Sequence, residues 1–411
     1  MIRPPMRGRR FTRALVVAAL TVAGCATMGG EPGPDPALRA QHALGARRVL
    51  VLAVSFPGIE PGTTLAQLQE RVLQRSADYY ATQSWGKTTL VGDVKGWYRL
   101  PRPLDDYKVS PYNVEVDRRR VRLLVEDALN AAERDVVFGQ YDHIAITVGI
   151  ETRPGIGYGM IAYSANPGML SRYIRLGQVR MWEIATRGGQ RFQGGIIVVA
   201  QNAHPGHIVH DLAHALGGVI RGKRPIPDLY NTVLQGKVGP LTPEAYPKYT
   251  VFMGPWDVMS RHFVAPRQPV PGMSSFTRLR MGWIADDQVV DVAPGEARTV
   301  RLAPLADGRG TLVVRIPGPR QTSYLLEYRR RLPGDPVPPA TGLLVLRVDE
   351  SREDGDGIVR VVDASPGVPD FGAATFGLRP GQTASVQLPP DATIEVLTQR
   401  DAELTVRVTR R

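Results

Sequence analysis

The stretch GGIIVVAQNAHPGHIVHDLAHALG, residues 194–217, joins an apolar run to a segment that carries four histidines. Its first seven residues are rich in β-branched side chains, which predicts a buried strand. Pro205 suits the first turn of a following helix, and Gly217 suits its end. His210 and His214 are four residues apart, so they project from the same side of that helix. The stretch therefore predicts a strand that leads directly into a histidine-bearing helix.

The segment HDLAH, residues 210–214, differs at one position from HExxH, in which two histidines bind zinc and the glutamate activates water. Asp211 stands where the glutamate is expected, and its side chain is shorter by about 1.5 Å, one C–C bond. A proton acceptor must come within about 2.6–3.2 Å of its donor, or act through one water. Taken alone, two histidines at this spacing favour hydrogen-bonded residues without a metal.

Features downstream of the helix favour a metal site over that alternative. Asp228 lies in the segment PDLY, which places an acid in a turn fourteen residues after His214 and ends at Tyr230. The segment WDVMS, residues 256–260, resembles the methionine turn that lies beneath the zinc of metzincin peptidases, with Met259 as the methionine.

Together with other segments, these motifs resemble the immune inhibitor A family of metallopeptidases, a metzincin-like group. The matching segments follow the family's order and cover roughly residues 47–365. They are RVLVLAVSF (48–56), YY (79–80), SWGK (84–87), GDV (92–94), GWY (96–98), LRMGWI (279–284), YLLEYR (324–329) and GLLVLRVD (342–349).

The resemblance implies an α+β fold with a metzincin-like α/β zinc-peptidase domain. It also implies a site in which zinc is the cofactor. The implied residues are His210, His214 and Asp228 as metal ligands, Asp211 as general base, Met259 as the turn methionine, and Tyr230 and Gly217 as supporting residues.

Two departures from the family pattern concern this site. In the family the acid follows the second histidine more closely, so about eight residues within Gly218–Ile226 are inserted here, which a loop absorbs at modest entropic cost. The insertion leaves His207 and His204 as rival ligands, for which we favour positions behind the ligands or on the surface. The second departure is Asp211, which predicts either a slow zinc-dependent endopeptidase or a pseudopeptidase that binds without efficient catalysis.

The remaining pattern predicts two folded parts. For residues 47–288 the succession of strands and helices is that of an α/β sandwich. The predicted strands are 48–56, 90–100 (or a hairpin arm), 141–150 and 194–200, and helices are predicted after the capping-box segment 64–67 and near 114–132. Over 289–411, short β-rich runs alternate with turns, which predicts a β-rich, sandwich-like domain packed on the first. The runs are 298–302, 311–316, 324–328, 342–348, 358–363, 383–388, 393–398 and 403–408.

Residues 1–24 resemble a lipoprotein signal peptide, with a basic start and an apolar run too short to span a bilayer as a stable helix. Cys25, the only cysteine, ends the segment VAGC and is the expected lipidation site. Residues 25–46 are rich in Gly, Pro and Ala and predict a flexible tether. We expect an exported envelope protein, anchored by lipid to the membrane, with outer-membrane sorting the weaker inference. An ordinary signal peptide with an incidental cysteine is the alternative.

The charge distribution bears on partners. The net charge of +12 falls to +7 without the five leader arginines, and the other basic residues are dispersed, which argues against nucleic acid binding. The expected partner is an extended protein or peptide substrate; carbohydrate binding by the β-rich part is a weaker alternative. Asp257 and Asp349 are acids in turns, for which capping is favoured over a role as Ca²⁺ ligands. The oligomeric state is not predicted.

Overall fold

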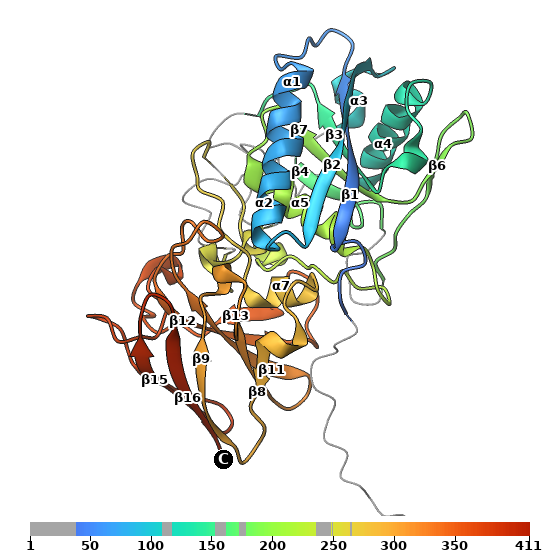
Figure 1. Cartoon of the computed structure of the whole chain (residues 1–411). Coiled ribbons are helices and arrows are strands. Elements are labelled where there is room, and N and C mark those ends of the chain that lie inside the picture. Colours follow the sequence, from blue (N-terminus) through green and yellow to red (C-terminus); the bar gives the residue numbers. More distant parts are fainter. Residues whose placement is uncertain are drawn as a thin grey trace, which may run out of the picture. The chain divides into compact units, whose positions relative to one another are not determined.

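Five strands of the N-terminal half form one sheet, in the order β2-β1-β3-β7-β4 (Figure 1). Its strands are β1 (Gly45–Ser55), β2 (Thr88–Arg99), β3 (His143–Val148), β4 (Ala162–Asn166) and β7 (Gly195–Ala200). Strands β2, β1, β3 and β7 are parallel, whereas β4 runs antiparallel to β7. β2 is thus a parallel neighbour of β1 rather than a hairpin arm. The computed structural model describes residues 38–108, 117–152, 162–171, 178–235, 248, 250–263 and 265–411.

Helices lie on both faces of this sheet, as Figure 1 shows for α2 and α4. The chain between β1 and β2 is helical throughout residues 65–83, as α1 (Leu65–Leu68), the π-helical η1 (Gln69–Gln74) and α2 (Arg75–Gln83). Thr64 and Gln67 form the predicted capping box, since each side chain accepts from the other's backbone N–H. α4 (Arg118–Ala132) begins after its N-cap Asp117, so the predicted second helix is confirmed from residue 118 onward; the predicted residues 114–116 lie outside the described part of the chain.

Successive residues of β1 point to opposite faces and divide the interior into two cores. Val49 and Val51 pack in the core on the side of α2, whereas Leu50 and Leu52 pack in the core on the side of α4. The buried strands expected from apolar runs are therefore buried on both faces, as in other parallel sheets.

The predicted strand-to-helix stretch is confirmed as β7 followed by α5 (Pro205–Gly217). His204 is the N-cap, because its Nδ1 accepts a hydrogen bond from the Gly206 N–H at 3.0 Å. Pro205 occupies the first turn, where the missing N–H is not needed. All residues of α5 after Pro205 are buried, so the histidine helix lies inside the protein and not on its surface.

The C-terminal part contains two further sheets, with the orders β13-β12-β11-β10-β8 and β14-β15-β16-β9. Their strands are β8 (Val289–Asp291), β9 (Ala297–Leu302), β10 (Val313–Pro317), β11 (Thr322–Arg329), β12 (Gly342–Asp349), β13 (Val359–Val361), β14 (Ser385–Leu388), β15 (Ala392–Gln399) and β16 (Leu404–Arg410). Neighbours are antiparallel except β8, which runs parallel to β10. Each β-rich run predicted after residue 289 is a strand, and apolar residues from both sheets share one core, as in a sandwich.

One hydrophobic core extends through both parts of the chain. Leu212 of α5 belongs to the same buried cluster as Val313 of β10 and Leu344 of β12. The alternate residues Val314 and Val345 face the sandwich core instead. The sheet that contains β10 and β12 is therefore buried on both faces. A mixed α+β fold with several sheets is confirmed, and the metzincin-like character of its first part stays a prediction.

The shorter elements connect these layers. They are α3 (Leu104–Tyr107), η3 (Phe138–Gln140), β5 (Ile184–Ala185), β6 (Arg191–Phe192), α6 (Thr232–Gln235), η5 (Gly254–Trp256), η6 (Val258–Ser260), α7 (Ser275–Arg280), η7 (Asp286–Gln288), η8 (Leu305–Asp307) and η9 (Pro369–Phe371). Strands β5 and β6 pair with each other as a two-stranded sheet.

The described end of the predicted tether packs against the end of α5. The N–H groups of Gln41 and His42 donate to the carbonyl oxygens of Gly217 and Leu216, at 3.1 and 3.0 Å. Leu38 is buried, and β1 already begins at residue 45. The prediction of a flexible tether is therefore wrong for residues 38–46, which backbone hydrogen bonds and burial hold in place.

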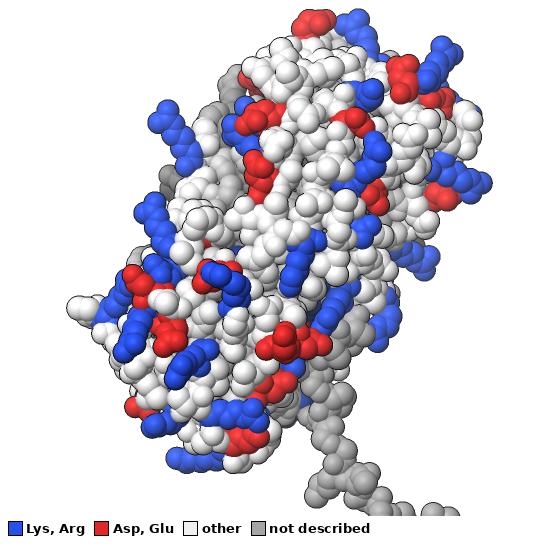
Figure 2. Space-filling model, viewed as in Figure 1, with Lys and Arg blue, Asp and Glu red and all other residues white. Residues whose placement is uncertain are grey.

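The predicted signal peptide and Cys25 lie outside the described residues, as does the tether up to residue 37. Among the helices that the structure describes, none has the length and apolar character needed to cross a membrane. On the face drawn in Figure 2, Lys and Arg side chains are interspersed with Asp and Glu.

Candidate metal centre

The two histidines of α5 are fixed in one orientation by backbone carbonyl groups. His210 Nδ1 donates to the carbonyl oxygen of Val258 at 3.0 Å, and His214 Nδ1 donates to that of Ile226 at 2.8 Å. A carbonyl oxygen can only accept, so each Nδ1 carries a proton and each Nε2 of the neutral ring carries a lone pair. This is the arrangement that orients histidine ligands in metal sites.

The free ring nitrogens meet the carboxylate of Asp228. His210 Nε2 and His214 Nε2 lie 3.0 and 3.2 Å from Asp228 Oδ1, and 3.3 Å from each other. Three acceptors at these distances repel one another unless a proton or a metal ion lies among them. Zinc bonds of about 2.0–2.1 Å at tetrahedral angles separate the ligand atoms by about 3.3 Å. The donor set and its spacing therefore fit zinc.

Charge and burial give two of the three candidate ligands, Asp228 and His214, the form that a metal requires. Burial would raise the pKa of Asp228, but the charge of Arg224 and the hydrogen bonds with the two histidine rings hold it well below its ordinary value. Burial, and then the charge of Arg224, lower the pKa of His214 to about 4. Burial also opposes the charge on His210, but Asp228 outweighs it and raises the pKa of that ring. The centre thus offers an ionised carboxylate and a neutral imidazole, which are the metal-binding forms.

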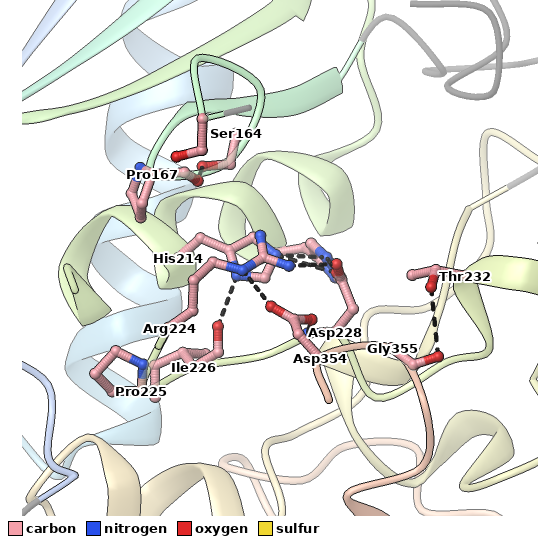
Figure 3. Close-up of polar contacts among 12 residues, drawn as sticks. Ser164, Pro167, His214, Arg224, Pro225, Ile226, Asp228, Thr232, Asp354 and Gly355 are labelled. Carbon is pink, nitrogen blue, oxygen red and sulfur yellow. Dashed lines mark hydrogen bonds and ion pairs between the residues drawn. The ribbon is translucent and has the colours of Figure 1, made fainter. Parts of the chain in front are cut away.

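Asp228 is itself held by residues that the sequence did not single out. Arg224 Nη2 donates to Asp228 Oδ2 at 2.6 Å, which leaves Oδ1 facing the histidines. Arg224 Nε donates to Asp354, whose Oδ1 accepts from the Asp228 N–H at 2.8 Å. Figure 3 shows the guanidinium of Arg224 beside both carboxylates. The loop of residues 218–226, expected to be an insertion, therefore does not separate Asp228 from the histidines; it contributes Arg224 and the Ile226 carbonyl to the centre.

Asp211 lies beside this cluster and is buried. Ligand atoms of His210, Asp211 and His214 lie within 4.8 Å of one another, so this group could hold a metal ion. Burial raises the pKa of Asp211 to about 7, with the charges of His210 and Arg224 acting in the opposite direction. Its carboxylate also interacts with the backbone of Ser164 in β4. A carboxyl group with a pKa near neutrality suits proton transfer.

The two rival histidines point elsewhere. His204 caps α5, and its ring stacks on that of Phe263 with centroids 4.4 Å apart. His207 Nε2 lies 3.2 Å from the backbone nitrogen of Phe263, whose N–H it accepts. These contacts agree with positions behind the ligands. Both rings are buried, so the alternative of a surface position is wrong.

The predicted methionine turn is η6, and it supports two ligands at once. The Val258 carbonyl holds His210, while the Met259 carbonyl accepts the Leu229 N–H at 2.9 Å, next to Asp228. The Met259 side chain is fully buried. The turn thus connects α5 to the segment that carries the acid.

Tyr230 and a histidine absent from the sequence-based candidates pack beside His210. The ring of His262 lies 4.5 Å from that of Tyr230 and 6.0 Å from that of His210, centroid to centroid. Its position three residues after Met259 is the signal that could have revealed it. Gly217 is the last residue of α5, as predicted, although the positive φ of +66° belongs to Gly218.

Asp257 and Asp349, the two acids that the sequence places in turns, accept hydrogen bonds from protein donors. Asp257 is fully buried and accepts hydrogen bonds from the Met259 N–H, the N–H and hydroxyl of Ser274, and the hydroxyl of Thr277, at 2.6–2.8 Å. Asp349 accepts from the residues two and three positions later. Both acids therefore make the contacts of turn-capping residues.

Comparisons with known proteins add no family to this picture. No protein-family model matches the chain, and a search of curated proteins finds no match. The similarity to the immune inhibitor A family consequently stays a prediction that rests on the segments quoted above.

Proposed function

We propose that this chain is a zinc-dependent endopeptidase in which His210, His214 and Asp228 are the metal ligands. The observation that carries the proposal is the convergence of three acceptor atoms at 3.0–3.3 Å in a buried site. Each ligand also has its other polar atom bonded, the two Nδ1 atoms to carbonyls and Asp228 Oδ2 to Arg224. Such support behind the ligands is typical of a metal site.

The chemistry that zinc supplies when bound is polarisation of a carbonyl group and activation of water at neutral pH. In this proposal Asp211 takes up the proton of the attacking water and returns it to the leaving nitrogen. β4 is an edge strand of the sheet, and its Ser164 contacts Asp211. An extended peptide can pair with the edge of a sheet, so we propose an extended peptide as the substrate.

A pseudopeptidase is the second candidate, and Asp211 is the observation that favours it. The acid is one methylene shorter than the glutamate usual at this position, and misplacement by about 1 Å can cost on the order of 100-fold in rate. Such a protein would keep the metal and bind peptides or envelope components without cleaving them.

Cleavage of unfolded casein by the purified chain distinguishes the two candidates. A peptidase is expected to cleave casein, to lose activity with a zinc chelator and regain it with added zinc, and to be inactive as His214→Ala. His42→Ala, a histidine outside the centre, is the control and should cleave like the wild type. A zinc-loaded wild type that leaves casein intact would contradict the peptidase and support the pseudopeptidase.

Export and lipid attachment at Cys25 form part of the same proposal and rest on the segment VAGC alone. Expression in a diderm bacterium with a labelled fatty acid tests them. The label should enter the wild-type chain and be absent from Cys25→Ala, whereas an unlabelled wild type would contradict a lipid anchor.

A further inference from the structure

The third candidate ligand, Asp228, is held from three directions. Arg224 donates to its Oδ2, Asp354 accepts from its backbone N–H, and the Gly355 N–H donates to its carbonyl oxygen at 3.1 Å. Arg224 and Asp354 are also bonded to each other, so the three residues form a closed ring of contacts that passes through the Asp228 backbone N–H. Asp228 therefore has little freedom to turn its Oδ1 away from the histidines.

The loop that carries Asp354 comes from the C-terminal part, between β12 and β13, and lies against the chain after Asp228. The Thr232 N–H donates to the Gly355 carbonyl at 3.1 Å, and Figure 3 shows the two residues side by side. Gly355 has a φ of +72°, and a Cβ there would lie 2.3 Å from Thr232 Cγ2. Only glycine suits this position, which indicates that the close approach of the loop is built into the sequence.

Burial makes the balance of charges in this ring important. The side chains of Arg224, Asp228 and Asp354 are 3%, 9% and 10% exposed. The Arg224 cation lies between two carboxylates, so the ring as a whole carries one negative charge. Without Asp354 the negative charge of Asp228 would be cancelled by Arg224, so the ring would attract a divalent cation at Asp228 less strongly.

We propose that Arg224 and Asp354 are a positioning pair that fixes Asp228 Oδ1 as a metal ligand, so that the C-terminal part completes the centre. This inference rests on the proposed metal site. Arg224 sets which carboxylate oxygen faces the histidines. Asp354 holds the backbone of Asp228 and balances the charge of Arg224. The β-rich part is in this respect a component of the metal site and not a separate binding module.

The test is the zinc dissociation constant of the full-length chain, measured by competition with a chromophoric chelator. Asp354→Asn keeps an oxygen for the Asp228 N–H but removes the balancing charge, and Arg224→Gln releases Asp228 Oδ2. Each is expected to weaken zinc binding by about 10–100-fold, the usual effect of losing a residue behind a metal ligand. Asp356→Asn, a more exposed acid two residues along the same loop, should bind zinc like the wild type.

The double variant Arg224→Gln/Asp354→Asn makes the test sharper. It removes the cation together with its counter-charge, so the loss should be smaller than the product of the two single losses. The melting temperature in chelator shows whether each variant folds; a purely structural role would lower it and leave the dissociation constant unchanged. If Arg224→Gln does not fold, Asp354→Asn decides alone.

The outcomes separate this inference from the proposed function. If the wild type binds zinc and Asp354→Asn binds it equally well, the positioning pair is overturned and the proposed function stands. If the wild type binds no zinc, the proposed function fails, and the inference fails with it.

Discussion

At the scale of single residues, the proposal of a metal centre depends on which histidine ring nitrogens carry protons. The carbonyls of Val258 and Ile226 fix the Nδ1 protons of His210 and His214, so in the neutral rings both Nε2 atoms face Asp228 as acceptors. A buried cluster of this kind is unfavourable in the absence of a cation. This geometry supports the proposed metal site.

Asp211 is the residue on which catalysis depends in this account. Asp211→Asn removes the proton acceptor and should lower kcat by about 10²–10⁴-fold, the usual contribution of acid–base catalysis, while zinc content stays the same. Asp211→Glu restores the usual reach and should raise kcat by about tenfold or more. Steady-state cleavage of a fluorogenic peptide measures both. An Asp211→Asn enzyme as fast as the wild type would exclude this residue as the base.

His143 lies far in sequence from the candidate metal centre, and its burial should make the stability of the folded chain depend on pH. Burial lowers its pKa to about 3, below the ordinary value of 6.5. The unfolded chain therefore binds one more proton than the folded chain between these values. The stabilisation is present above about pH 6.5 and is lost as the pH falls towards 3.

His143→Asn tests this pH dependence, because its amide oxygen can still accept the Gly195 N–H that His143 Nδ1 accepts. Between pH 6 and pH 4, the unfolding free energy of the variant should fall less steeply with decreasing pH than that of the wild type. A difference of one bound proton changes this slope by about 1.4 kcal/mol per pH unit. Urea titrations at several pH values measure the slope. Identical slopes would show that His143 does not titrate as inferred.

The sequence could predict the ligands but not what lies behind them. His210, His214 and Asp228 carry a local signal, because helical spacing and a nearby turn place them on one side of α5. Asp354 carries none, since it lies 130 and 126 positions from Arg224 and Asp228 in the chain. Arg224 lies only four residues before Asp228 but belongs to none of the motifs quoted above. His262 had a local signal in its distance from Met259, which sequence reasoning missed.

At the scale of elements, the position of α5 depends on how closely it packs on the sheet. A Cβ at Gly195 of β7 would lie 2.4 Å from the Cβ of Ala215 in α5 and 2.8 Å from His143 Nδ1. The helix lies this near the strand because residue 195 has no side chain. That contact therefore helps to set the position of His210 and His214, the two candidate ligands.

Gly195→Ala should therefore displace α5. Overpacking at a buried contact costs about 1–3 kcal/mol of unfolding free energy, and the shifted helix should also weaken zinc binding. Chemical denaturation and chelator competition measure the two effects. Gly139→Ala is the matched control, because a Cβ there meets nothing within 4 Å. Equal stability and zinc affinity in the two variants would contradict the role of this contact.

Local patterns predicted the elements better than their pairing. The apolar runs gave β1, β3 and β7, and the capping box marked the start of the first helix. β4 and β8 were missed because they are short and lie among turns, and β8 pairs parallel to β10. The parallel pairing of β2 with β1 depends on the helix between them crossing over the sheet. A short stretch of sequence does not show such a crossover.

At the scale of the whole molecule, the two parts of the chain are joined by a shared core and a shared site. Leu212 of α5 and Leu344 of β12 belong to one buried cluster, and Asp354 reaches Asp228. The sequence placed a boundary near residue 288 because composition changes there. Composition cannot show that the sheet beyond it is buried on both faces.

Truncation after residue 288 should abolish the fold of the α/β part, because it exposes the face of the core that β10, β11 and β12 cover. We expect the fragment to lack a cooperative thermal transition by circular dichroism and to bind no zinc. The full-length chain, measured alongside, should show both properties. A truncated chain that melts cooperatively and binds zinc would contradict the shared core.

X-ray diffraction at the zinc absorption edge, from crystals of the zinc-loaded chain, would show directly whether these three residues bind the metal. We expect one anomalous peak bonded to His210 Nε2, His214 Nε2 and Asp228 Oδ1, with Arg224 still on Oδ2. A peak bonded to His207 or His262 in place of Asp228, or no peak between the helix and Asp228, would contradict this expectation.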